Sequence, residues 1–98
     1  MEEDLFNLSG KIVVLTGGLG FLGRNYTKVL ICKGATVVIL DLAKQKDAER
    51  ILSFNFSKDE LKNKCFYYQA NIANERILTR VKKEILNKFK KIDVLINN

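Results

Sequence analysis

The sequence predicts an α/β fold in which a doubly wound parallel sheet forms from a β-α-β-α-β-α-β order, with the strands in the spatial order 3-2-1-4. Three observations support this. Short apolar runs rich in β-branched residues alternate with segments of helical periodicity. A glycine cluster directly follows the first apolar run. The chain has 98 residues, 47% of them hydrophobic, which suits a single domain with one real core.

The first half of the chain predicts two buried strands with a helix between them. Lys11–Thr16 and Thr36–Asp41 are short, apolar and β-branched, as in parallel strands covered on both faces. From about Gly20 to Lys33 the apolar residues recur with a helical period, and Gly34 is placed to end the helix. The apolar residues that share one face of this predicted helix are Leu22, Tyr26, Val29 and Leu30.

Residues 44–64 are more polar than the rest of the chain. Ala48, Ile51 and Leu52 in this stretch indicate a helix. The segment Ser57–Glu60 has the spacing of a capping box, in which a serine and a glutamate three residues apart satisfy each other's backbone N–H groups. A second short helix is therefore expected to begin there.

Two more strands and one helix complete the predicted order. Cys65–Ala70 and Ile92–Asn97 have the composition of a third and a fourth strand. Between them, a helix is predicted from about residue 75 to residue 90, because apolar residues repeat every three to four positions. These residues are Leu78, Val81, Ile85 and Phe89.

A glycine-rich turn joins the first strand to the first helix. Thr16–Gly23 (TGGLGFLG) matches G-x-G-x-x-G with glycines at 18, 20 and 23, and G-x-x-G-x-x-G with glycines at 17, 20 and 23. In such turns the glycines allow the tight bend, the approach of a pyrophosphate and close helix packing, while the helix N-terminus attracts phosphate. Strand, turn, helix and second strand together predict a Rossmann-type dinucleotide site. The alternative is a tight strand–helix turn without a ligand.

An acidic residue stands where a dinucleotide fold places its ribose-binding carboxylate. Asp41 ends the second predicted strand, 18 residues after Gly23. Leu42 follows it, and the first basic residue beyond is Lys44. No basic side chain therefore lies where the family of dinucleotide folds binds the 2′-phosphate of NADP. The sequence therefore predicts NAD rather than NADP as the cofactor. The alternative role for Asp41 is a helix N-cap or an acid of the loop.

The composition excludes several kinds of site. The chain has no histidine, so it contains no imidazole base, no Ser–His pair and no His-ligated zinc. Its two cysteines, Cys32 and Cys65, lie 33 residues apart and form no CxxC motif. No metal site is predicted, and both cysteines are expected in or near the core.

The charge and the N-terminus bear on partners and location. The net charge of +6 comes mainly from basic residues between 76 and 91, which we interpret as the solvated face of a helix rather than a nucleic-acid contact. No apolar window reaches the length of a membrane span. The first four residues, Met1-Glu2-Glu3-Asp4, are unlike a signal peptide, so a cytoplasmic location is expected.

These residues together resemble the short-chain dehydrogenase/reductase family, from about Leu8 to Asn98. The resemblance rests on Leu8–Lys11 before the first strand and on the glycine turn after it. It also rests on Gly34-Ala35, Asp41, Ala70–Ile72 and the closing Ile92–Asn98, whose end resembles the family's Asn-Asn-Ala-Gly motif. The family binds a dinucleotide and transfers hydride, so the resemblance implies NAD contacts at Gly17, Gly20, Phe21, Leu22, Gly23, Asp41, Leu42, Asn71, Ile72 and Asn97.

The chain departs from the family pattern at two of these positions. Classical members usually carry T-G-x-x-x-G-x-G, which would place glycine where this chain has Phe21. The spacing found here is more typical of extended members such as nucleotide-sugar epimerases and dehydratases, whereas the Asn97-Asn98 ending is classical, so both subfamilies stay open. Asn71 stands where the family commonly has an aspartate that contacts the adenine amine, and its side-chain carbonyl can still accept a hydrogen bond from that amine.

The third departure concerns catalysis. The family's acid–base work is done by a Tyr-x-x-x-Lys pair, and none of the three tyrosines here is followed by lysine at that spacing. Residues 1–98 are therefore interpreted as the N-terminal, cofactor-binding part of a Rossmann domain, without catalytic residues and inactive alone. The resemblance implies a small-molecule substrate and a homo-oligomer for the full-length enzyme. A non-catalytic NAD-binding module and a nucleic-acid-binding domain are the competing interpretations.

Overall fold

The computed structural model describes residues 6–98, so the acidic run Met1–Asp4 lies outside the described residues. The elements follow the expected order, with two helices between the second and third strands. They are β1 (Ile12–Thr16), α1 (Phe21–Cys32), β2 (Thr36–Asp41), α2 (Gln45–Ser53), α3 (Lys58–Asn63), β3 (Cys65–Gln69), α4 (Glu75–Phe89) and β4 (Val94–Asn97). Predicted and observed ends differ by no more than two residues.

The four strands form one parallel sheet in the order β3-β2-β1-β4, which confirms the predicted fold class and topology. Val14 in β1 lies between Val38 of β2 and Leu95 of β4. Because all strands run the same way, the segments that follow β1, β2 and β3 emerge at one edge of the sheet. We call this the carboxyl edge.

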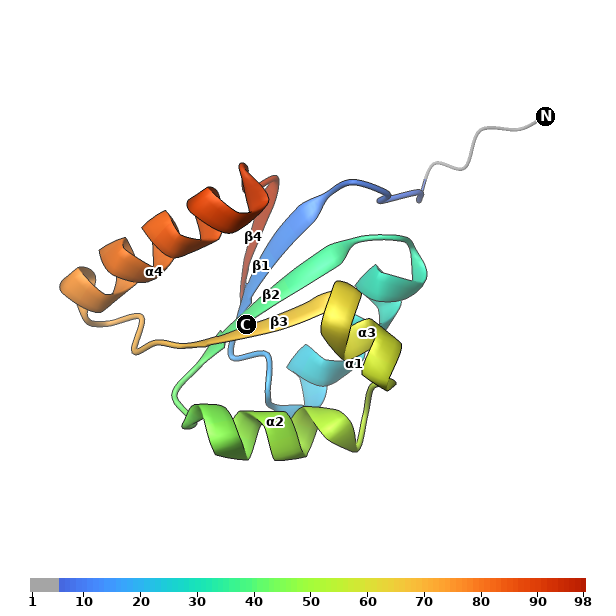
Figure 1. Cartoon of the computed structure of the whole chain (residues 1–98), viewed down its shortest axis with the longest axis horizontal. Helices are drawn as coiled ribbons and strands as arrows, with labels where there is room; N and C mark the ends of the chain where they lie inside the picture. Colours follow the sequence, from blue (N-terminus) through green and yellow to red (C-terminus); the bar gives the residue numbers. More distant parts are fainter. Residues whose placement is uncertain (1–5) are drawn as a thin grey trace.

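Helices cover both faces of the sheet, as Figure 1 shows. Alternate residues of β1 and β2 enter two separate cores. One core, which includes Leu15 and Ile39, lies under α1, α2 and α3. The other, which includes Val14 and Leu40, lies under Val81 and other residues of α4. Burial on both faces explains why β1 and β2 are apolar without interruption.

The apolar face expected for α1 is not the face that packs on the sheet. Leu22, Tyr26 and Val29 are exposed, whereas Gly23 and Thr27 are fully buried. The Thr27 hydroxyl donates to the carbonyl of Gly23 at 2.8 Å, so this polar group is satisfied inside the helix. The helix approaches the sheet through its small residues, and only Leu30 of the predicted face packs against the core.

The polar stretch after β2 folds as α2 and α3. The capping box at the start of α3 is present, since the Ser57 hydroxyl accepts from the Glu60 N–H and the Glu60 carboxylate accepts from the Ser57 N–H. Of the two phenylalanines between the helices, Phe56 is buried and Phe54 is exposed. Phe56 therefore anchors the connection to the core under α1 and α2.

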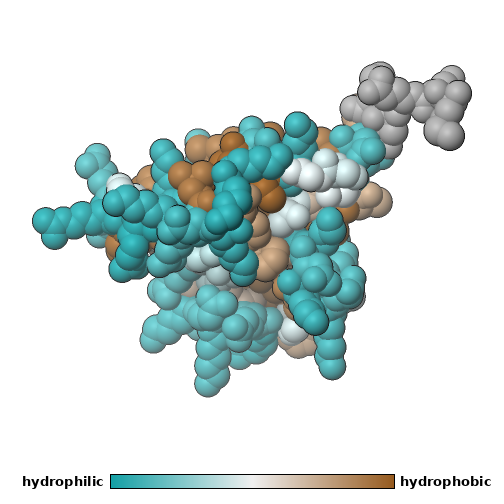
Figure 2. Space-filling view, turned by 45° about the horizontal axis from the view of Figure 1, so that its top comes forward, coloured by the Kyte–Doolittle hydropathy of each residue, from teal (hydrophilic) through white to brown (hydrophobic). Residues whose placement is uncertain are grey.

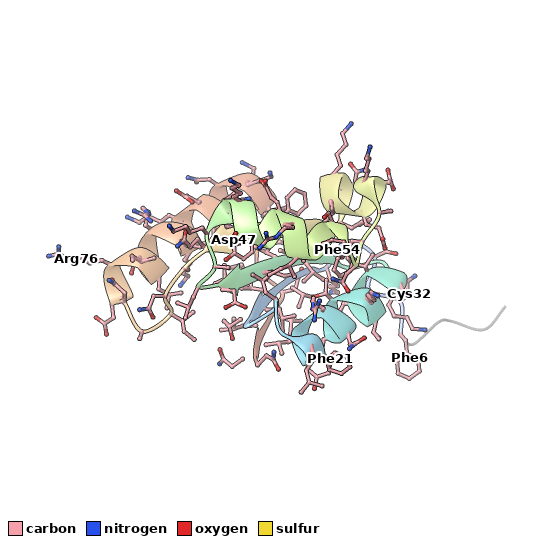
Figure 3. The ribbon with its side chains drawn as sticks, turned by 90° about the horizontal axis from the view of Figure 1, so that it is seen from below. Phe6, Phe21, Cys32, Asp47, Phe54 and Arg76 are labelled. Atoms are coloured by element: carbon pink, nitrogen blue, oxygen red, sulfur yellow. The ribbon has the colours of Figure 1, made fainter. Side chains whose placement is uncertain are left out.

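Polar side chains gather over one face of the molecule and along α4. Hydrophilic side chains cover most of the face shown in Figure 2. The basic side chains of the α4 region are exposed, and Figure 3 shows Arg76 extending away from that helix. These exposed residues are Arg76, Arg80, Lys82, Lys83, Lys88, Lys90 and Lys91. Across residues 6–98, none of the helices combines the length and the apolar character that crossing a bilayer requires.

Asp93 ties β1 to β4 at the opposite, amino edge of the sheet. Its carboxylate accepts from the Ile12 N–H at 2.7 Å and pairs with Lys91 at 3.1 Å, while its own N–H donates to the Ile12 carbonyl. The bond from the Ile12 N–H, followed by the one from Lys91, lowers the pKa of Asp93 below its ordinary value. A carboxyl with a lowered folded-state pKa stabilises the fold above its unfolded pKa, and this contribution is lost as the pH falls through the folded value.

We therefore expect Asp93→Asn to lower the free energy of unfolding at pH 7. The difference from wild type should shrink as the pH is lowered below about 4, the unfolded-state pKa of aspartate. Urea unfolding across this pH range measures it. Asp47→Asn is the matched control, because Asp47 pairs with Arg50 on the surface of α2 at 3.6 Å. Equal stability of Asp93→Asn and wild type at pH 7 would contradict this role.

Candidate functional site

The carboxyl edge gathers every residue that the sequence predicts to contact a dinucleotide. The glycine turn follows β1, and Asp41 and Leu42 stand at the end of β2. Asn71 and Ile72 follow β3, and Asn97 ends β4 next to β1. The Ala70 N–H donates to the Asp41 carbonyl at 2.8 Å, which holds the ends of β2 and β3 together. Ligands of open α/β sheets bind at this edge.

Three of the four glycines in the turn are required by the fold itself. Gly17 has a φ of +65°, a left-handed backbone conformation that residues with a Cβ atom rarely adopt. A Cβ on Gly18 would lie 2.5 Å from the Ile39 side chain, and a Cβ on Gly23 would lie 2.6 Å from the Gly17 carbonyl oxygen and the Gly18 Cα. Gly23 therefore lets α1 begin in direct contact with the turn that leaves β1.

Gly20 is different, because nothing in the fold requires a glycine there. It caps α1 with ordinary extended angles, a φ of −70° and a ψ of 170°. The nearest atom to a Cβ built on it is the Gly17 carbonyl oxygen, at an ordinary contact distance of 3.6 Å. The position is exposed and its missing side chain leaves open space in front of the helix. That space is where a pyrophosphate would approach the backbone.

The N-terminus of α1 is suited to an anion. No side chain caps the helix, and its first turn contains no acidic residue. Its leading N–H groups have no partner within the helix, and the helix dipole adds positive potential. Phe21 and Leu22 are exposed, and Figure 3 shows Phe21 directed away from the sheet. Phe21 therefore occupies the family's glycine position without crowding the turn.

The carboxylate of Asp41 is oriented by two backbone N–H groups. One oxygen accepts from Leu19 in the glycine turn at 3.1 Å, and the other accepts from Leu42 at 2.8 Å. The first bond links β2 directly to the glycine turn. The alternative role as a helix N-cap is wrong, because α2 begins after Lys44 and has no side-chain cap. Asp41 is half-buried, so its oxygens are held at the edge next to solvent.

Leu42 and Ile72 provide two exposed apolar side chains at the same edge, following β2 and β3. Apolar side chains in these places can cover the faces of a purine. The side-chain oxygen of Asn71 accepts from the Ala73 N–H at 3.0 Å. This local bond uses one lone pair of the oxygen predicted to receive the adenine amine, and a second lone pair remains.

The end of β4 supports the glycine turn. The Asn98 amide donates to the Gly17 carbonyl at 3.0 Å, and the Asn98 N–H donates to the Thr16 hydroxyl at 3.2 Å. The Asn97 side-chain oxygen lies 3.4 Å from that hydroxyl. Asn98 is a site residue that sequence reasoning missed, although it is the second residue of the Asn-Asn pair. Its two hydrogen bonds hold the glycine turn against the end of β4.

Neither cysteine forms part of the site. Cys65 begins β3 and is buried, and this burial, followed by the nearby charge of Glu60, raises the pKa of its thiol to about 12. A thiol with so high a pKa is a poor nucleophile at neutral pH. Cys32 is exposed at the end of α1, contrary to the expectation of a near-core position. Within residues 6–98 no group of histidine, cysteine and acidic side chains could hold a metal ion.

Comparisons with known proteins bear on the family and the fold of this chain. A model of the family described as short chain dehydrogenase matches residues 11–98. "Short-chain dehydrogenase reductase 3a" of Arabidopsis thaliana is 31% identical over 91 residues, which cover 93% of this chain and 33% of that protein. The chain therefore spans about a third of the length of this relative.

Solved structures share the fold. A short chain dehydrogenase from Bacillus anthracis superposes with a TM-score of 0.78 at 28% identity, over 94% of this chain and 36% of that one. A structure from Haemophilus influenza described as a putative D-mannonate oxidoreductase with bound NAD has a TM-score of 0.74 at 25% identity. The match covers 91% of this chain and 30% of that one.

The different surroundings of the glycines predict different costs of substitution. Gly23→Ala should destabilise the chain by about 1–3 kcal/mol, because the added methyl group meets backbone atoms that cannot move aside. Gly20→Ala should cost less than about 1 kcal/mol, the loss expected at a helix N-cap. Thermal and urea unfolding of the two variants measures this difference. Equal costs would contradict the assigned packing.

Proposed function

This chain belongs to the short-chain dehydrogenase/reductase family, and we propose that it is the NAD-binding part of an enzyme that transfers hydride between NAD and a carbonyl or alcohol carbon of a small molecule. In that role the chain binds and orients the cofactor. When bound, the nicotinamide supplies the hydride chemistry. The acid–base pair that the family uses would come from residues outside this sequence.

The observation that carries the proposal is the open space at Gly20 in front of the uncapped N-terminus of α1. A turn that served only the fold would need Gly17, Gly18 and Gly23 but would tolerate a side chain at position 20. Pyrophosphate binding explains the glycine at position 20, because the phosphates must approach the backbone N–H groups. The residues present therefore fit a dinucleotide.

Asp41 supports NAD as the preferred form of the cofactor. Its carboxylate is directed by the N–H groups of Leu19 and Leu42, next to the turn. In this position its oxygens would accept hydrogen bonds from the adenosine ribose hydroxyls, and its negative charge would repel a 2′-phosphate. Leu42 and Ile72 would enclose the adenine.

The family matches favour a dehydrogenase over the nucleotide-sugar epimerase that the glycine spacing suggests. Both the matching family model and the Arabidopsis relative are described as short-chain dehydrogenases. The substrate class, assembly as a homo-oligomer and a cytoplasmic location remain parts of the proposal. A polypeptide that contains these residues together with a Tyr-x-x-x-Lys pair should turn over an alcohol or a carbonyl compound, and residues 1–98 alone should not. Turnover by neither would favour a non-catalytic NAD-binding module.

We expect Gly20→Val to abolish NAD binding while the chain stays folded. The branched side chain suits the extended angles of this position but would occupy the pyrophosphate space. Isothermal calorimetry measures NAD binding, and circular dichroism measures helix content. Lys28→Arg, about two turns further along the same helix, is a control that keeps the charge and the backbone at an exposed position. Normal NAD affinity in a folded Gly20→Val chain would show that the turn has no role in binding.

The charge of Asp41 is expected to set the preference between NAD and NADP. Wild type should bind NAD more tightly than NADP. Asp41→Asn should reduce this difference in affinity, because the amide keeps an acceptor oxygen but loses the negative charge. Two unit charges about 4 Å apart repel by roughly 4 kcal/mol at an effective dielectric of about 20, which sets an upper limit of about a thousandfold. Calorimetric titration with both nucleotides gives the ratio. Equal affinities in wild type would remove this role from Asp41.

A further inference from the structure

The loop that carries Asp41 is held by side chains of the neighbouring strand. The chain leaves β2 at Asp41 and passes through Leu42 and Ala43 before α2 begins. We call residues 41–43 the ribose loop, a name that rests on the proposed function. Its conformation determines where the Asp41 carboxylate and the Leu42 N–H lie, and these two groups are hydrogen-bonded to each other.

Two side chains of β3 lie within hydrogen-bond distance of all three carbonyl groups of the ribose loop. The Tyr67 hydroxyl lies within hydrogen-bond distance of the Asp41 carbonyl, at 3.0 Å, and of the Ala43 carbonyl. The Gln69 amide donates to the Leu42 carbonyl at 3.2 Å. Residues two apart on a strand share one face of the sheet, so both side chains reach the loop together.

These contacts are distinct from the packing of the strand. The Tyr67 ring packs against the core under α1 and α2, and its hydroxyl alone reaches the loop. Burial, followed by the charge of Asp41, raises the pKa of Tyr67 to about 12, so the hydroxyl remains a donor at neutral pH. Without it, the Ala43 carbonyl would lose this partner, and the end of the loop would be held less firmly against β3, while the Ala70 N–H would still bind the Asp41 carbonyl.

We propose that Tyr67 and Gln69 are positioning residues that set the preference for NAD over NADP by holding the ribose loop, and thereby the Asp41 carboxylate, in place. Neither side chain would itself contact the bound dinucleotide. A carboxylate held in one place discriminates strongly between a ribose hydroxyl and a phosphate. A mobile carboxylate can turn away from the phosphate and discriminates less.

Tyr68 provides a matched control on the same strand. It points to the opposite face of the sheet and packs in the core under α4. The substitutions Tyr67→Phe and Tyr68→Phe remove the same atom, but only the first removes a contact to the ribose loop. A general loss of strand stability would affect both variants, whereas a change in cofactor preference is expected in only one.

The test is the ratio of NAD to NADP affinity, measured by calorimetry on the full chain. Tyr67→Phe should reduce the ratio by roughly two- to tenfold, the effect of one net hydrogen bond, while Tyr68→Phe should leave it unchanged. Gln69→Leu should also reduce the ratio of NAD to NADP affinity. Because the Gln69 side chain is exposed, this variant still tests the positioning role if Tyr67→Phe fails to fold. Thermal melting establishes that each variant is folded.

The possible outcomes separate this inference from the proposed function. If wild type prefers NAD and the ratio is unchanged in folded Tyr67→Phe and Gln69→Leu, the positioning role is wrong and the proposed function stands. An equal reduction in Tyr68→Phe also overturns the role. If wild type binds neither nucleotide, the proposed function fails and the role fails with it.

Discussion

The close contact between Gly23 and the turn after β1 determines how α1 packs on the sheet and where the candidate site forms. A Cβ at position 23 would lie 2.6 Å from both the Gly17 carbonyl oxygen and the Gly18 Cα. Only a glycine allows α1 to begin this close to the end of β1. The contact places the N-terminus of α1 at the carboxyl edge, and it directs the small residues of the helix, including Thr27, toward the sheet.

The candidate site is an assembly of backbone groups oriented by side chains from neighbouring strands. Asn98 braces the glycine turn from β4, and Asp41 joins the turn from β2 through the Leu19 N–H. Tyr67 and Gln69 hold the loop after β2 from β3. Each strand end is thus tied to its neighbour in the sheet. A dinucleotide lying across this edge would meet groups that are already in place, which lowers the entropic cost of binding.

Local sequence pattern was sufficient to predict the strands and their order, because the two central strands are buried on both faces and therefore continuously apolar. The same pattern places the candidate site at the carboxyl edge, where the glycine turn follows β1. The pattern was misleading for α1, where Leu22, Tyr26 and Val29 form an apolar face that is exposed. Periodicity identifies an apolar face but cannot say that a helix packs through glycine and threonine. The contacts of Tyr67 and Gln69 were missed because they depend on the pairing of β3 with β2.

If the N-terminus of α1 and the loop after β2 together receive a dinucleotide, NAD should change the environment of their backbone amides. Backbone amide NMR spectra of the full chain, recorded during titration with NAD, measure this change. We expect the largest shifts in the amides of Gly20, Leu22, Gly23 and Leu42, while those of Ile12 and Asp93 at the amino edge stay unchanged. Shifts confined to α4 or to the amino edge, or no shifts at saturating NAD, would contradict this expectation.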